Sequence, residues 1–302
     1  MIKKLPPEDI VIRPPVESSS ILIAVTSGCS WNRCRFCGTY KGIYGGIQDY
    51  KIRLLEDVFQ DIDYYSRKQY FGVPVFLAGG NPTSTSTEYL VQILKYIRKK
   101  LKNVPRISSY AKALDILRKS DDELKQISEA GLNIVYMGLE SGSSKILRIM
   151  KKGTNADSMI KAGKKTLTAG IDLSLYIILG LGGYKYSKEH IEETARVLTE
   201  INPTIFRFRT LNIIPNTPLW DEWKNNKYEL LKPVDCIKEE KGIISKLGPN
   251  VNSQVFNDHI SNYCNLESLN IKDDREKFIK ALEDLISNQK IQSLQRKNLI
   301  RM

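Results

Sequence analysis

Residues 21–40 read ILIAVTSGCSWNRCRFCGTY. The first five are apolar and mostly β-branched, which predicts a short buried strand. Three cysteines, Cys29, Cys34 and Cys37, follow within nine residues, in the loop that begins where this strand is expected to end. In barrel enzymes of alternating strands and helices, the catalytic groups lie at the C-terminal ends of the strands. We therefore expect the cysteine loop to be the functional centre.

The cysteine count indicates a metal or redox centre. Of five cysteines, Cys236 and Cys264 stand alone in the sequence, and in a reducing cytosol a cluster of three points to a metal rather than to disulfides. Three thiolates suit zinc or an iron–sulfur cluster. A structural zinc ion needs a fourth ligand, which Cys236, His259 or Cys264 would have to supply. Zinc and three merely buried thiols are the less favoured alternatives.

The rest of the chain alternates expected strands with expected helices. A capping box at Ser120–Glu123 marks the start of one helix and Gly131 follows its end. Six such units in a row imply parallel strands with right-handed crossovers, as an open sheet or a partial barrel. Further strands are expected at 73–77, 106–110, 133–139, 173–179 and 205–213, and helices at 54–65, 90–101, 144–169 (one helix or a pair) and 188–201.

The order of the expected elements predicts three segments, in a protein that we expect to be cytoplasmic. We expect an N-terminal extension (1–19), an α/β core (20–219) and a C-terminal extension of helices and loops (220–302), with a helix near 274–287 and a polar, basic, frayed tail from 289. No apolar run is long enough to span a bilayer, and the first residues lack a signal peptide's apolar stretch. The net charge of +12 raises the possibility of RNA binding, but the lysines are spread along helices, so solvated helix faces are favoured.

Four motifs give the chain a more specific resemblance. The cysteine loop, with the aromatic Phe36 before its last cysteine, resembles the cluster motif of the radical S-adenosylmethionine (SAM) superfamily. The usual motif is CxxxCxxC, whereas here four residues separate the first two cysteines. The other three motifs each fall at an expected strand end: Gly79-Gly80-Asn81, Gly138-Leu139-Glu140-Ser141-Gly142, and Ile177 to Gly183. Residues 215–219, PNTPL, are similar to a closing segment of the branch with oxygen-independent coproporphyrinogen oxidases and methylthiotransferases.

The resemblance implies a partial (β/α)6 barrel, with a C-terminal helical and loop extension, that carries an oxygen-sensitive [4Fe-4S] cluster on Cys29, Cys34 and Cys37. The open iron would bind SAM, whose reductive cleavage gives a 5′-deoxyadenosyl radical that takes a hydrogen from an unidentified substrate. An electron donor such as ferredoxin or flavodoxin is implied. The cofactor-binding residues implied are Phe36, Gly79, Gly80, Asn81, Glu140, Ile178 and Arg207.

Each of these assignments has a plainer alternative. Gly79 and Gly80 also suit a tight turn, and Asn81 stands where the family usually has an acid, so a role for its side chain is not implied. Glu140 could instead be an acid stabilised at a helix N-terminus. Arg207 and Arg209 share a face of their strand, so both point either to SAM or a substrate carboxylate, or to solvent.

The substrate-side residues are sought in the C-terminal extension. Residues 259–266, HISNYCNL, resemble a segment of uncharacterised radical SAM proteins of similar length. Tyr263 or Cys264 could donate a hydrogen and His259 could contact the substrate, while a loop packed by its own tyrosine is an equal alternative. A haem or cluster carrier without turnover and an RNA-modifying enzyme remain the alternative functions.

Overall fold

The computed structural model describes residues 12–41 and 49–296, which fall into two compact units. Both units alternate parallel strands with helices, which confirms the predicted α/β class. Unit 1 comprises the described part of Met1–Asn32, Gly38–Met137 and Lys164–Leu173; unit 2 comprises Arg33–Cys37, Gly138–Gly163 and the described part of Ser174–Met302. The boundary divides the cysteine loop, so Cys29 belongs to unit 1 and the other two cysteines of the loop to unit 2.

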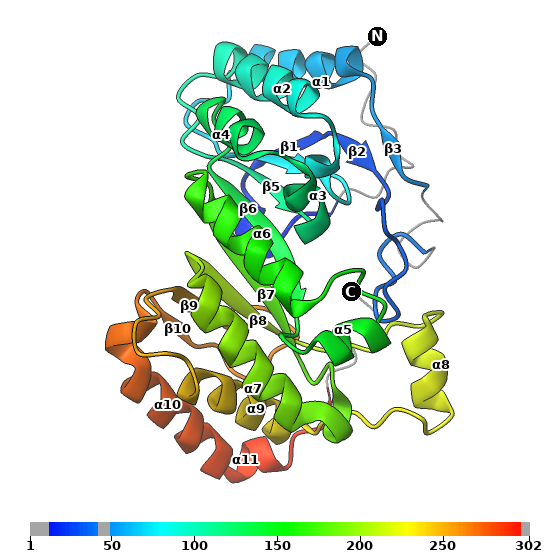
Figure 1. The fold of residues 1–302 in the computed structure, drawn as a ribbon, viewed down its shortest axis with the longest axis vertical. Helices are drawn as coiled ribbons and strands as arrows, with labels where there is room; N and C mark the ends of the chain where they lie inside the picture. Colours follow the sequence, from blue (N-terminus) through cyan, green and yellow to red (C-terminus); the bar gives the residue numbers. More distant parts are fainter. Residues whose placement is uncertain (1–11, 42–48, 297–302) are drawn as a thin grey trace. The chain divides into compact units, whose positions relative to one another are not determined.

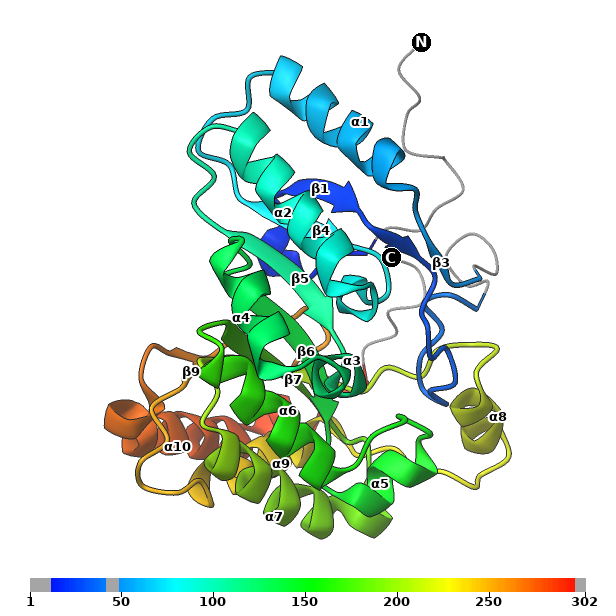
Figure 2. The ribbon, with the colours of Figure 1, turned by 45° about the horizontal axis from the view of Figure 1, so that its top comes forward.

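Unit 1 is built on parallel strands that are buried on both faces. β1 (Ile21–Ala24), β4 (Val75–Ala78), β5 (Ile107–Ala111) and the first part of β6 (Ile134–Glu140) pair in this order. Helices α1 (Leu55–Arg67) and α2 (Thr87–Lys100) lie side by side, and α1 also contacts β1 (Figures 1 and 2). The smaller elements of this unit are η1 (Pro15–Glu17), β2 (Thr26–Ser27), β3 (Lys51–Ile52), η2 (Pro82–Ser84), α3 (Ala113–Arg118) and α4 (Asp121–Glu129).

Local sequence explains where these helices begin and end. α2 buries an apolar stripe spaced by three and four residues, from Leu90 to Ile97. The predicted capping box of α4 is confirmed, because Ser120 accepts from the Glu123 amide while the Glu123 carboxylate accepts from the Ser120 amide. Gly131 follows that helix with a φ of 112°, a conformation that glycine adopts without a Cβ penalty.

A fully buried carboxylate ties η1 to the strands of unit 1. Glu17 accepts hydrogen bonds from the hydroxyls of Ser20, Ser108 (2.9 Å) and Tyr136, and it forms an ion pair of 2.8 Å with Arg106. These donors come from three separate elements, so a single side chain fixes the position of the N-terminal segment against β5 and β6.

We expect Glu17→Ala to destabilise the protein by about 3 kcal/mol, because the change removes the acceptor shared by three buried hydroxyls and the ion-pair partner of Arg106. Urea denaturation at pH 7 measures the effect. Ser18→Ala, at an exposed neighbouring position, is the matched control and should change stability by less than about 0.5 kcal/mol. A loss below about 1 kcal/mol for Glu17→Ala would contradict the role given to this network.

Unit 2 continues the parallel arrangement. β7 (Asp172–Leu179) pairs with β8 (Ile205–Thr210), and β8 pairs with β9 (Gln254–Phe256), while β10 (Glu267–Ser268) runs antiparallel to β9. Helix α9 (Pro233–Ser245) contacts both α7 (Gly183–Ile201) and α10 (Ile271–Ser287) (Figure 1). The remaining helices are α5 (Ser144–Ile149), α6 (Ala156–Thr168, which ends in unit 1), α8 (Pro218–Lys224) and α11 (Gln289–Gln292).

Three expectations for the chain are corrected here. The helix expected from 188 begins earlier, at Gly183, whereas the segment from 144 to 169 is a pair of helices, one of the two expected alternatives. The strand alternation does not stop at Pro218, because β9 adds a parallel strand that is too short to show a period in the sequence. The tail expected from 289 contains α11, and Arg296 donates to the carbonyls of Leu211 and Leu231, while residues 1–11 and 297–302 lie outside the described part.

Candidate functional site

The two glycines after β4 lie directly against the start of the cysteine loop. The Gly80 amide donates to the Gly28 carbonyl at 2.9 Å. A Cβ on Gly80 would lie 2.6 Å from the Cα of Cys29 and still closer to the Gly28 carbonyl oxygen. Gly79 has a φ of 112°, and a Cβ there would collide with the Thr26 backbone. Glycine is therefore required at both positions for backbone contact with the loop, whatever ligand binds there.

Asn81 is fully buried and holds the residue that follows Cys29. Its Nδ2 donates to Asp115 Oδ2 (2.6 Å) and to Ser30 Oγ (2.9 Å), and its Oδ1 accepts from the Ser30 amide (3.2 Å). Lys112 Nζ also donates to Ser30 Oγ, at 2.8 Å. The sequence showed no role for this side chain, and Asp115 and Lys112 were missed because they lie more than thirty positions away from Asn81 or Ser30.

The second part of the cysteine loop is anchored within unit 2. Cys34 and Cys37 are half-buried and the Cys37 amide donates to the Cys34 carbonyl at 3.4 Å. Arg35 between them donates from its amide to Met150 O (3.0 Å), from its guanidinium to Ile149 O (3.1 Å), and pairs with Glu222 of α8. Phe36 packs against the apolar cluster of α5, α8 and the strand ends, made of Ile146, Met150, Leu181, Leu211, Ile213 and Leu219.

Glu140 ends β6 in a left-handed conformation and forms a mostly buried ion pair. Its φ is 62°, and its carboxylate accepts from Lys152 Nζ at 2.6 Å, with side-chain exposures of 12% and 17%. A Cβ on Gly138 would lie 2.7 Å from Lys152 Nζ and closer still to Glu140, so the pair also explains this glycine. α5 begins only at Ser144, whose preceding Ser143 caps it. The structure therefore gives Glu140 an ion-pair partner rather than a place in a helix N-terminus.

Lys152 also faces the two cysteines of unit 2. Burial alone would lower the pKa of Lys152, but the negative charges of Glu140 and of the Cys34 and Cys37 thiolates outweigh burial and raise it well above its usual value. Lys152 therefore stays charged beside these two cysteines. The sequence gave no sign of this, because Lys151-Lys152 reads as an ordinary solvated pair.

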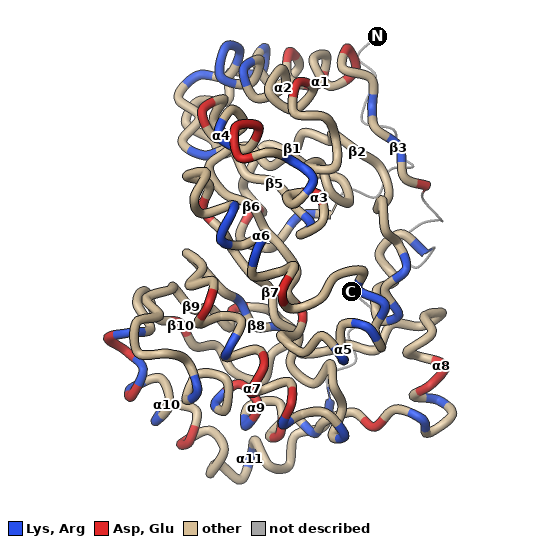
Figure 3. Tube along the Cα trace, viewed as in Figure 1, with Lys and Arg blue, Asp and Glu red and all other residues tan. Residues whose placement is uncertain are grey.

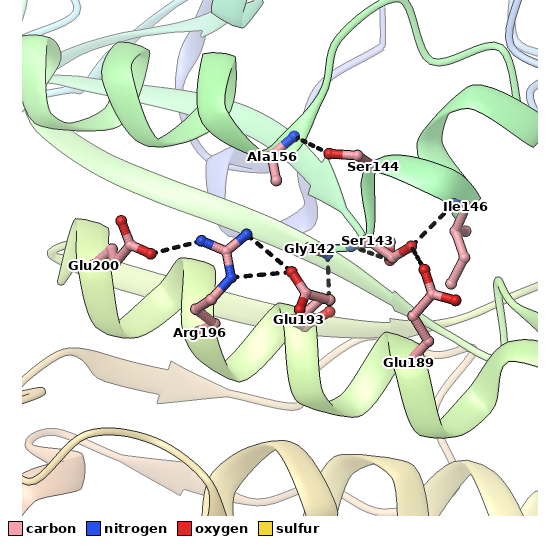
Figure 4. A network of polar contacts seen from close by, with 11 residues as sticks. Gly142, Ser143, Ser144, Ile146, Ala156, Glu189, Glu193, Arg196 and Glu200 are labelled. Atoms are coloured by element: carbon pink, nitrogen blue, oxygen red, sulfur yellow. Dashed lines mark hydrogen bonds and ion pairs between the residues drawn. The ribbon is translucent and has the colours of Figure 1, made fainter.

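A hydrogen-bond network supports the backbone that follows Glu140. The Gly142 amide donates to Thr194 Oγ1 (2.9 Å) and the Ser143 hydroxyl donates to Glu189 (2.5 Å), both on α7 (Figure 4). Buried His190 shares a hydrogen bond of 2.8 Å with Ser141 Oγ. Burial lowers the pKa of His190 to about 4, so at neutral pH it is uncharged, and its distance of 3.7 Å to Glu239 is not an ion pair.

The predicted residues on β7 and β8 lie as follows. Ile178 is half-buried on β7 and packs against the apolar cluster that Phe36 also contacts. Arg207 is buried and forms an ion pair with Asp258 at 2.5 Å, so the solvent-facing alternative is wrong for this side chain. Arg209 is half-buried, and its guanidinium carbon lies 4.3 Å from the ring centre of Tyr176.

The predicted substrate-side loop is bound to the C-terminal end of β8. The Thr210 amide donates to Ser261 Oγ (3.1 Å), and Asn262 donates to the Phe208 carbonyl (2.8 Å). His259 is half-buried and its Nδ1 contacts Ser261 Oγ at 2.7 Å. Tyr263 is half-buried as well. The loop thus borders the strand end where barrel sites form, and the roles of His259, Tyr263 and Cys264 stay predictions.

Cys264 lies beside a buried acid. Asn257 Nδ2 donates to Glu240 Oε2 (2.5 Å) and to Cys264 Sγ (2.9 Å), while Glu240 Oε1 and Asn257 Oδ1 are buried without a hydrogen-bond partner. Burial raises the pKa of Glu240 to about 8. Cys236 is buried on α9, and burial raises the pKa of its thiol to about 12, which opposes thiolate chemistry there.

We expect Glu240→Gln to stabilise the protein increasingly as pH rises from about 5 to 8. In this window the unfolded chain loses the Glu240 proton while the folded chain keeps it, so stability of the wild type falls with pH. A glutamine has no proton to lose, and its amide can donate to the partnerless Asn257 Oδ1.

Urea denaturation at pH 6 and pH 8 tests this. The gain of Glu240→Gln over the wild type should grow by up to about 1.4 kcal/mol per pH unit. Glu88→Gln, at an exposed position on α2, should keep the wild-type profile. A gain that is the same at both pH values would show that Glu240 is already ionised in the folded protein.

The cysteine loop supplies thiols, the type of donor that binds an iron–sulfur cluster. Among the described residues the five cysteines form no disulfide, and the three of the loop are half-buried. Within residues 12–41 and 49–296, no group of three or more His, Cys, Asp or Glu side chains is arranged so that it could hold a metal ion. The assignment of an iron–sulfur cluster rests instead on three thiols in one loop, which backbone contacts at Gly80 and Arg35 hold in place. The cation of Lys152 lies beside two of these thiols.

Comparison with known proteins gives one family. The model of the radical SAM superfamily matches residues 23–198, more than half of the chain. Among curated proteins, the heme chaperone HemW of Bacillus subtilis (strain 168) is 22% identical over 157 residues, 52% of this chain and 41% of its own length. Anaerobilin synthase of Escherichia coli O157:H7 is 23% identical over 207 residues, 67% of this chain and 45% of its own. The chain thus spans less than half the length of both relatives.

Solved structures confirm the partial barrel. Coproporphyrinogen III oxidase (HemN) from Escherichia coli, described as a radical SAM enzyme, aligns with a TM-score of 0.52 at 16% identity, covering 75% of this chain and 50% of that one. Methylornithine synthase aligns with a TM-score of 0.52 at 17% identity, covering 76% and 63%. At these identities the likeness shows the fold alone.

Two broader expectations concern partners. Basic and acidic residues both occur on the helices of the two units, and α6 carries three lysines and one aspartate (Figure 3). The expectation that these residues form solvated helix faces rather than a nucleic-acid surface stays a prediction. Within residues 12–41 and 49–296, no helix combines the length and the apolar character needed to cross a membrane.

Proposed function

Because the chain belongs to the radical SAM superfamily, we propose that it is an enzyme that holds one [4Fe-4S] cluster on Cys29, Cys34 and Cys37 and starts radical chemistry with SAM. The observation that carries the proposal is the three-thiol loop, which follows β1 and β2 and is contacted by the glycines that follow β4. When bound, the cluster and SAM supply a 5′-deoxyadenosyl radical that removes a hydrogen atom from the substrate.

The chain's own residues then bind and orient SAM. Glu140 offers a carboxylate that can accept hydrogen bonds from SAM hydroxyl or ammonium groups, and Lys152 holds that carboxylate in place. Gly79 and Gly80 have no side chain, so their backbone can come close to SAM. Ile178 and Phe36 offer apolar surface to it. Asn81 acts as a positioning residue, because its side chain fixes Ser30 next to the cluster ligand Cys29.

A haem carrier without turnover is the second candidate, favoured by one observation, the similarity to the heme chaperone HemW. The two functions share a cluster and differ in the use of SAM. Tetrapyrrole binding in the absence of any SAM cleavage would favour the carrier.

The cofactor content is tested by anaerobic reconstitution with iron and sulfide, followed by reduction. We expect about four iron atoms per chain and an electron paramagnetic resonance signal that changes when SAM is added, because SAM binds the open iron. Stoichiometric zinc in protein purified without oxygen would refute the proposal. A cluster signal that SAM leaves unchanged would reduce it to an electron carrier.

A further inference from the structure

Two arginines on β8 share one face but have different surroundings. Arg207 and Arg209 alternate with Phe206 and Phe208, which are fully buried on the opposite face. Across the sheet, Arg207 pairs in register with Tyr176 of β7 and Phe256 of β9, and Arg209 pairs with Ile178. Both guanidinium groups therefore lie on the face that carries Ile178.

Arg207 is neutralised within the protein. Its guanidinium forms an ion pair of 2.5 Å with Asp258 and lies 4.2 Å from the ring centre of Phe256. Only 7% of its side chain is exposed. An anionic ligand would have to compete with Asp258 for this arginine, so Arg207 is a poor binding site for a second carboxylate.

Arg209 lacks such a counter-ion. Its guanidinium is stacked over Tyr176 at 4.3 Å, and among the described residues no Asp or Glu oxygen lies within ion-pair distance of it. Its Nε is buried without a hydrogen-bond partner. A half-buried, ring-stacked guanidinium whose Nε has no partner in the protein can bind a planar anion, because its fork of N–H groups matches carboxylate and phosphate oxygens.

We infer that Arg209, held by Tyr176, binds an anionic group of the substrate, a carboxylate or a phosphate. The inference rests on the proposed function, because it assigns the anion to the substrate. Arg209 precedes Thr210, whose amide donates to Ser261 Oγ and whose hydroxyl donates to Asn262 Oδ1. These two residues belong to the loop expected on the substrate side. Glu140, the carboxylate proposed above for SAM, lies on β6, whereas Ile178, a proposed apolar contact of SAM, pairs in register with Arg209.

The test uses the reconstituted full chain without reductant, so that it does not depend on SAM cleavage. Thermal midpoints are measured with inorganic phosphate and with glutarate, against chloride at equal ionic strength. We expect one or both probes to raise the midpoint of the wild type, with an affinity that Arg209→Gln weakens by at least about tenfold. A larger effect of phosphate would indicate a phosphorylated substrate, and a larger effect of glutarate a carboxylic acid.

Matched variants separate this site from general charge effects. Arg207→Gln should leave probe affinity within about twofold of the wild type, and Arg209→Lys should recover part of it, since a point charge replaces the fork. Asp258→Asn removes the counter-ion of Arg207 and should therefore make a second guanidinium group available to the anionic probe. Probe binding that is absent in the wild type, or that survives Arg209→Gln, would overturn the inference.

The same assay distinguishes the two sources of the anion. With SAM at saturation, the probe effect should persist, because the inference assigns Arg209 to the substrate and not to the cofactor. If SAM abolishes the probe effect and Arg209→Gln weakens SAM binding, the arginine serves the cofactor and the inference is wrong while the proposed function stands. If the chain neither binds nor cleaves SAM, the proposed function fails whatever the probes do.

Discussion

Replacing Cys34 with alanine is expected to reduce reconstituted iron from about four atoms per chain to less than about one, and to abolish SAM cleavage. With two ligands left, a cubane cluster cannot be retained, and Lys152 loses one of the two thiolates that it faces. The same result is expected for Cys29→Ala and Cys37→Ala. Iron and sulfide analysis with the visible absorbance of the cluster measures the effect.

Cys236→Ala is the matched control for this prediction. Cys236 is 1% exposed on α9, and burial raises the pKa of its thiol to about 12, so it is unsuited to bind iron as a thiolate. We expect its alanine variant to keep the wild-type iron content. Full iron in Cys34→Ala, or a lost cluster in Cys236→Ala, would show that the ligand set is assigned wrongly.

Gly80→Ala is expected to prevent cluster assembly nearly as completely, although no ligand is removed. The new methyl group would lie 2.6 Å from Cys29 Cα, and the obstructing atoms are backbone, which cannot move aside cheaply. It would also separate the Gly80 amide from the Gly28 carbonyl. We expect iron retention to fall by at least about tenfold while circular dichroism stays that of a folded protein.

Gly72→Ala provides the comparison for a glycine without this contact. Gly72 has a φ of 66°, yet nothing lies within 4 Å of an added Cβ. The variant should lose about 1 kcal/mol of stability from backbone strain and keep its cluster. Equal iron content in the Gly80 and Gly72 variants would mean that the contact between β4 and the cysteine loop is dispensable.

Motifs local in sequence were predictable, and contacts between distant residues were not. The capping box at Ser120, the glycine at 131 and the strand ends near Gly79 and Glu140 follow from short-range rules and from the family resemblance. The ion pair of Arg207 joins residues 51 positions apart, and Glu17 binds Tyr136 at a separation of 119. Periodicity carries no information about such pairs.

The site showed the same division. The cysteine ligands, the glycines and Glu140 are recognisable by type and spacing, whereas Lys152 is indistinguishable in sequence from the many solvated lysines. Asn81 differs from these residues. It stands where the family usually has an acid, so the sequence implied no role for its side chain, but its hydrogen bonds to Ser30 and Asp115 show a structural one.

The most direct test of the central claim is product formation from SAM. Reconstituted wild-type protein is reduced with dithionite in the absence of oxygen, and 5′-deoxyadenosine and methionine are quantified beside Cys34→Ala. The account predicts both products from the wild type in equal amounts and neither from the variant. A fully loaded, reduced wild-type cluster that binds SAM and yields no deoxyadenosine, with or without cell extract as a source of substrate, would contradict it.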